Sequence, residues 1–147
     1  MNMDTGKVQQ QGVASIEFAF MFVIVFAVFY GMISYVIPLL LLSSYNEISA
    51  EAVRASVLIP VNHEDYPAQV RQTVQAVIDE SWLGSRNASW KDQCEGYEGY
   101  VAFDTDRISV CIAHNAPEQI IPPITLFDWT FPQLPEALTG EASIQLR

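Results

Sequence analysis

A long uncharged run near the N-terminus, from Phe18 to Leu42, limits what this chain can fold into more than any other feature. As a helix with a rise of about 1.5 Å per residue, the run is about 38 Å long, and the hydrocarbon core of a bilayer is about 30 Å thick. A helix buried in a soluble core would show a polar stripe or be much shorter. The run therefore predicts a single membrane-spanning helix with some tilt.

Nearly all of the charge lies after this run. The 147 residues carry a formal net charge of −10, and from Ser43 onward fifteen Asp and Glu stand against six Lys and Arg. Nucleic acids and anionic membrane surfaces need a basic face, so the acidic balance argues against both as partners. Only a short tail precedes the run and a long polar segment follows it, so we expect the C-terminal part to be exported.

The two cysteines of the chain, Cys94 and Cys111, lie in the part that we expect to be exported. An exported pair in a small domain commonly forms a disulfide, and two free buried thiols are the alternative. A bridge would close a loop of about 18 residues, for which the chain-entropy estimate is about 3 kcal/mol.

The junction before the apolar run has an unusual order. A polar leader, residues 1–12, ends in Gly12, and small residues and Glu17 stand at the beginning of the run. A secretory signal peptide would instead place small residues after an apolar stretch of about 7 to 15 residues. The order resembles the processing site of type IV prepilins, where a peptidase cuts after a glycine and an acid stands at the fifth mature position. A cut between Gly12 and Val13 would make Glu17 that fifth residue.

The stretch from Gly12 to Ala19 more narrowly resembles the opening of TadE-like proteins of tight-adherence (Flp-type) pilus systems. Their pattern continues with an apolar helix that contains a glycine, here Gly31, and with a polar helical stretch rich in Ala, Glu and Arg, here residues 46–55. The resemblance implies a minor pilin or pseudopilin, not an enzyme, that needs no cofactor or metal. It also implies three partners, namely other pilin subunits, the prepilin peptidase, and the assembly platform in the bacterial inner membrane.

Glu17 and its neighbour Phe18 are the residues that we expect to contact a neighbouring subunit during assembly. A physical argument about Glu17 supports this role. A carboxylate within a membrane segment normally persists because it has a partner, and no basic residue is close to Glu17 on this helix. After cleavage, the new α-amino group of Val13 on a neighbouring subunit could pair with it and set the axial register. The alternative for Glu17 is a side chain that snorkels to the lipid interface. For the whole protein, the alternative function is an unprocessed, single-pass anchored binding module in the periplasm.

The sequence predicts an α+β fold in three parts. These are the leader 1–12, a long helix over 13–58 that spans the membrane at about 18–42, and an exported domain over 59–147. The domain is predicted to begin with a second helix from Pro67 to about Leu83, because Val70, Val74, Val77 and Ile78 recur at helical spacing. A loop over 85–99 follows.

Strand signals come after this loop. Residues 99–103 and 108–112 are β-rich runs separated by the turn 104–107, and 142–146 suits a last strand beside this hairpin. Prolines recur between residues 116 and 135 among apolar residues, which excludes a regular helix there. We expect extended chain in that segment, packed across its own domain or against a neighbouring subunit.

Motifs for other chemistries are missing from the sequence. His63 and His114 lack the spacing of a metal site, and the chain has neither a phosphate loop nor a nucleophile elbow. Asp104 and Asp106 are better explained by turn chemistry than by calcium. An anchored hydrolase therefore has no positive support.

Overall fold

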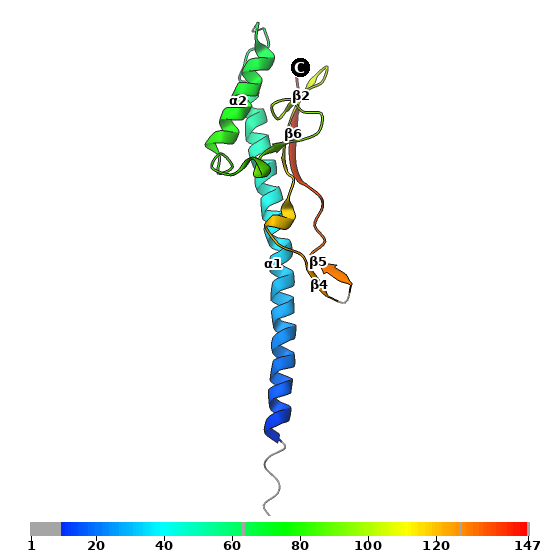
Figure 1. The fold of residues 1–147 in the computed structure, drawn as a ribbon. Helices are drawn as coiled ribbons and strands as arrows, with labels where there is room; N and C mark the ends of the chain where they lie inside the picture. Colours follow the sequence, from blue (N-terminus) through cyan, green and yellow to red (C-terminus); the bar gives the residue numbers. More distant parts are fainter. Residues whose placement is uncertain (1–9, 63, 127, 147) are drawn as a thin grey trace, which may run out of the picture. The chain divides into compact units, whose positions relative to one another are not determined.

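A computed structural model describes residues 10–62, 64–126 and 128–146 of the chain (Figure 1). The chain divides into two compact units, unit 1 over Met1–Val36 and unit 2 over Ile37–Arg147. The α+β class and the pilin-like order of elements are as predicted. The elements are α1 Gln10–Val57, α2 Tyr66–Glu80, the 3₁₀ turns η1 Ala88–Trp90 and η2 Pro117–Gln119, and the strands β1 Asp92–Gln93, β2 Val101–Phe103, β3 Arg107–His114, β4 Ile124–Leu126, β5 Trp129–Phe131 and β6 Leu138–Gln145.

Helix α1 is continuous through both the apolar run and the polar stretch that follows it. It runs from Gln10 to Val57 with Pro38 inside, against a prediction of 13–58. Its last turn tightens, because the N–H groups of Leu58 and Ile59 bond to carbonyls three residues back, at 3.3 and 3.2 Å. Pro60 then follows and has no N–H to continue the helix.

Helix α2 packs one face on the core. The buried residues Val70, Val74 and Ile78 recur every four positions, as predicted. The helix ends at Glu80, earlier than the predicted Leu83, because Ser81 takes an extended conformation and its hydroxyl donates to the carbonyl of Ile78 at 2.6 Å. Leu83 is nevertheless fully buried.

Strand β3 is the centre of the four-stranded antiparallel sheet. Strand β6 pairs with it along its whole length, from Arg107↔Gln145 to His114↔Leu138. Both β2 and β1 pair with β3 as well, β2 in the predicted hairpin and β1 with Ile112 and Ala113. The prediction of a loop over 85–99 was wrong at β1, because two polar residues carry no strand signal and become a strand only by pairing.

Backbone conformation shortens the first strand of the hairpin. Gly99 and Tyr100 have φ of 59° and 66°, which a strand does not allow, so β2 begins at Val101 and not at residue 99. The predicted turn is present, since the N–H of Asp104 donates to the carbonyl of Arg107 at 2.8 Å. The predicted last strand is also present, and it begins earlier, at Leu138.

The core of unit 2 lies between the helices and the sheet. Alternate residues of β3, namely Ile108, Val110 and Ile112, are fully buried on one face of the strand. They pack with residues of the C-terminal part of α1 and of α2 in one cluster, which includes Tyr45, Ile48, Ala52, Val53, Val70, Val74 and Ile78.

Strand β6 lies directly on the backbone of α1. A Cβ added at Gly140 would be 2.4 Å from the carbonyl carbon of Tyr45 and 2.6 Å from the nitrogen of Asn46. The buried hydroxyl of Ser49 donates to the carbonyl of Gly140 at 2.9 Å. The N–H of Glu141 donates to the side-chain oxygen of Asn46 at 3.2 Å. A glycine is therefore required where the strand crosses the helix.

In the proline-rich segment, the described residues 116–126 and 128–135 form no regular α-helix, in agreement with the prediction. It forms the turn η2 and then a two-stranded hairpin, in which β4 and β5 pair from Ile124↔Phe131 to Leu126↔Trp129. Asp128, in the connection, has a φ of 64°, and aspartate is one of the residues that tolerate this region. The prediction of extended chain did not include this pairing.

We expect Gly140→Ala to destabilise unit 2 by about 1 to 3 kcal/mol, because the new methyl group meets helix backbone that cannot move aside. The change is measured as a lower urea midpoint, with Thr139→Ala at the exposed neighbouring position as the control. An unchanged midpoint for Gly140→Ala would contradict the close contact between β6 and α1.

Candidate functional site

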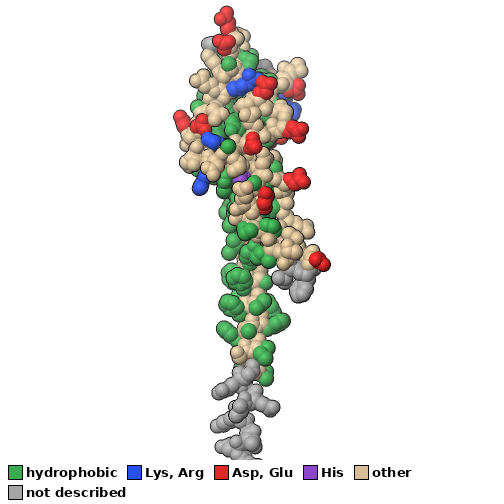
Figure 2. Space-filling model, viewed as in Figure 1, with side chains coloured by type: hydrophobic (Ala, Val, Ile, Leu, Met, Phe, Trp, Pro, Cys, Tyr) green, Lys and Arg blue, Asp and Glu red, His purple; other side chains and the backbone are tan. Residues whose placement is uncertain are grey.

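The most prominent surface feature of unit 1 is the apolar helix surface, which we define as the side chains of α1 from Val13 to Val36. Large apolar side chains are exposed along this stretch (Figure 2). Phe18 is 74% exposed, Phe26 63% and Met32 62%. Burying one such side chain is worth about 1.5 to 3 kcal/mol. A surface of this kind needs lipid or protein to cover it.

The apolar helix surface has no polar stripe. Among the described residues, α1 is the one helix that is long and apolar enough to cross a membrane. Its polar residue Ser34 is satisfied locally, since the hydroxyl of Ser34 donates to the carbonyl of Tyr30 at 2.7 Å, one turn earlier. Internal satisfaction of polar groups is what a lipid environment demands. The helix is therefore consistent with a membrane anchor.

Glu17 is the only charged residue between Val13 and Asn46. It lies on α1 with an exposed side chain, directly before Phe18. Val13, four residues earlier, is on the same helical face and about 6 Å away along the axis. The bond between Gly12 and Val13 is in the first turn of α1, and residues 1–9 of the predicted leader are outside the described residues. The structure thus presents one carboxylate at the beginning of an exposed apolar rod.

The predicted disulfide is present. Cys94 and Cys111 are bridged, with their Cα atoms 5.8 Å apart, and Cys111 is in β3 with only 4% of its surface exposed. The bridge links the segment before β2 covalently to the central strand β3.

The hydroxyl of Tyr97, three residues after Cys94, donates to a carboxylate oxygen of Glu141 at 2.8 Å. Burial, and then this hydrogen bond, raise the pKa of Tyr97.

His114 is a core residue in this structure. Its ring is fully buried, and its Nε2 is 3.1 Å from the carbonyl oxygen of Ala116. The ring centroid of Trp90 is 4.7 Å away, and that of Tyr45 is 6.5 Å away. Within residues 10–62, 64–126 and 128–146, no group of three or more His, Cys, Asp and Glu is placed to hold a metal ion. His63 is outside these ranges.

The predicted turn chemistry of the two aspartates is also present. A carboxylate oxygen of Asp104 accepts from the N–H of Thr105 at 2.8 Å. Asp106 accepts from the side chain of Gln145 at 2.6 Å, and its carbonyl accepts from the N–H of Leu146 at 2.6 Å. Both residues therefore serve the hairpin turn and the end of β6.

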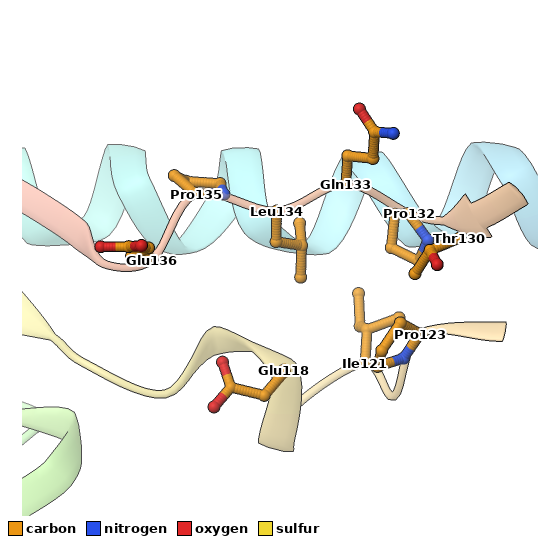
Figure 3. A pocket seen from close by; sticks show the side chains of 9 residues that line it. All are labelled: Glu118, Ile121, Pro123, Thr130, Pro132, Gln133, Leu134, Pro135 and Glu136. Carbon is orange, nitrogen blue, oxygen red and sulfur yellow. The ribbon is translucent and has the colours of Figure 1, made fainter. Parts of the chain in front are cut away.

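Sequence reasoning missed a hollow of about 350 Å³ in unit 2 (Figure 3). Ile121 and Leu134 point toward one another across it, and Glu118 and Glu136 lie at one end. The recurring prolines were the available signal, because they prevent the two extended segments from pairing into a filled sheet. The other residues that line the hollow are Pro123, Thr130, Pro132, Gln133 and Pro135.

Comparison with protein-family models, with curated proteins and with solved structures finds no match to this chain. The resemblance to TadE-like proteins over residues 12–19 stays an expectation from the sequence. The features of the chain that bear on its function are therefore the apolar helix surface, Glu17 and the folded unit 2.

We expect replacement of both bridged cysteines by alanine to lower the free energy of unfolding by about 3 kcal/mol, because the unfolded chain gains the freedom of an open loop. Urea denaturation of the double variant measures the loss, and the unsubstituted chain under reducing conditions is the control. Two titratable thiols in the unreduced, unfolded protein would contradict the bridge.

Proposed function

We propose that this chain is a minor pilin or pilin-like subunit of the TadE-like type. It is made as a precursor, anchored by α1 in the bacterial inner membrane with unit 2 in the periplasm, and cut between Gly12 and Val13. It then assembles with other pilin subunits through the apolar helix surface, in a structural and not a catalytic role. The observation that carries the proposal is the exposed apolar rod with one carboxylate, Glu17, four residues after Val13.

The position of Glu17 suits recognition between parallel helices. A charged side chain at the bilayer centre costs about 2.5 to 3.5 kcal/mol on insertion scales, so a carboxylate near lipid gains from a cationic partner. Cleavage creates such a partner at the α-amino group of Val13. A neighbouring helix displaced by about 6 Å along the axis brings its Val13 amine level with Glu17. Phe18, 74% exposed, packs in the same contact.

Unit 2 supports a specialised subunit over a main fibre subunit. It is a folded domain with its own core, a sheet and a disulfide, and a disulfide persists in an oxidising compartment such as the periplasm. By the resemblance, the main subunits of Flp-type fibres are very short. A bulky exported domain suits a minor, tip or priming subunit in assembly or adhesion.

The second candidate is an anchored periplasmic binding module that is never cut. The hollow between Ile121 and Leu134 favours it, since small ligands bind in concave sites of about 300 to 1,000 Å³. The two candidates differ in the fate of residues 1–12, which only the pilin proposal removes.

The N-terminal residue of the protein from a host with active prepilin peptidase is expected to be Val13. N-terminal sequencing or intact mass measures it, and Gly12→Leu is the matched variant that should keep its leader. An intact leader on the unsubstituted protein in such a host would rule out the pilin proposal and leave the binding module.

Glu17→Ala is expected to be cut normally and to lose its association with other pilins, because the Val13 amine of the neighbour loses its partner. Glu17→Gln, which keeps the shape of the side chain without its charge, should fail in the same way. Co-purification of pilin subunits after cross-linking measures association, with the exposed Glu47→Ala as the control. Normal association of Glu17→Ala would show that the carboxylate does not set the register.

A further inference from the structure

The hairpin formed by β4 and β5 is amphipathic. Ile124 is paired with Phe131, and Trp129 lies two residues before Phe131 on β5, so these three apolar side chains share one face of the two-stranded sheet. The pair between them, Thr125 and Thr130, is on the opposite face, with the two hydroxyl oxygens 3.5 Å apart.

The apolar face of this hairpin includes the most exposed tryptophan of the chain. Trp129 is 83% exposed and Ile124 is 47% exposed, whereas Trp82 is 39% exposed and packs its ring against those of Tyr45 and Trp90. A two-stranded hairpin is at best marginally stable in water by itself. Transfer of its exposed tryptophan from water to a less polar environment would therefore stabilise the hairpin.

The position of the hairpin within unit 2 and the charges near it indicate what kind of environment suits its apolar face. Figure 1 shows β4 and β5 at the end of unit 2 where α1 begins its course through that unit, far from the C-terminus. From Ile108 to Leu146 the sequence has no Lys or Arg, while Asp128 stands in the hairpin turn. Attraction to anionic lipid is therefore excluded, and a neutral interface suits the amphipathic indole of Trp129.

We propose that the hairpin is an interfacial anchor that inserts Trp129 and Ile124 among the headgroups of zwitterionic lipids, in the same membrane that α1 crosses. This proposal rests on the membrane anchoring within the proposed function. Insertion is shallow, because the Asp128 carboxylate must stay in contact with water or headgroups. The hairpin gives unit 2 a second point of attachment to the bilayer, in addition to α1. A subunit that leaves the membrane must therefore withdraw the hairpin from the lipid headgroups.

Tryptophan fluorescence tests the anchor on the full, uncut chain in phosphatidylcholine vesicles that contain brominated lipid. Bromine at carbons 6 and 7 of the acyl chain should quench part of the emission, more strongly than bromine at carbons 11 and 12. Most of this quenching should be lost in Trp129→Phe and retained in the matched control Trp82→Phe. Acrylamide in the water should quench Trp129 less in vesicles than in lipid-free urea.

Equal lipid quenching in Trp129→Phe and in the unsubstituted chain would overturn the proposal. The proposal would also be overturned if acrylamide quenched Trp129 in vesicles and this quenching were lost only after other pilin subunits were added. In that case a protein, and not lipid, covers the apolar face of the hairpin.

Protease protection of the leader, measured on the same vesicles, reports whether α1 spans the membrane. Spanning without quenching of Trp129 defeats only the hairpin anchor, whereas quenching of Trp129 without spanning defeats the proposed function and leaves an interfacial hairpin.

Discussion

The folded part of this protein depends on the contact between α1 and β6. Gly140 has no side chain, so the strand lies against the helix backbone at Tyr45 and Asn46, and the hydroxyl of Ser49 bonds across the contact. Because β6 pairs with all of β3, this one crossing positions the whole sheet against the C-terminal part of α1. The helix is thus a core element of unit 2 over its C-terminal part and an exposed apolar rod over its N-terminal part.

The two parts of α1 follow different physical rules. In unit 2 the helix buries Tyr45, Ile48 and Val53 against other elements, and burial of apolar area drives this packing. In lipid that driving force is absent, because the surrounding acyl chains are as apolar as the side chains. Association of such helices then depends on close packing and on polar pairs. In the proposed assembly, a single carboxylate at Glu17 would set the register of a segment that otherwise has little specificity.

Local patterns made several elements predictable. The absence of charge from Phe18 to Leu42 predicted the long helix, and the spacing of Val70, Val74 and Ile78 predicted the buried face of α2. The β-rich runs predicted β2 and β3, and the alternation of apolar and polar residues over 142–146 predicted β6. Two features were not predicted, namely strand β1, which has two residues, and the pairing of β4 with β5, which have three residues each. Strands this short exist because they pair with a partner strand, and their own composition does not reveal them. The hollow beside Ile121 was missed because its lining residues come from two segments, 118–123 and 130–136, and the recurring prolines alone do not specify how these segments pack.

By itself, the sequence determined that the chain has one apolar segment able to span a bilayer, with a single acid at its beginning and an acidic α+β region after it, because hydropathy, charge and periodicity are properties of neighbouring residues. Only the tertiary structure decided that α1 belongs to the core from Tyr45 onward, that Gly140 must be a glycine, and that Trp129 is left exposed on an amphipathic hairpin. These features depend on which residues meet across long sequence separations, and local patterns do not contain that information.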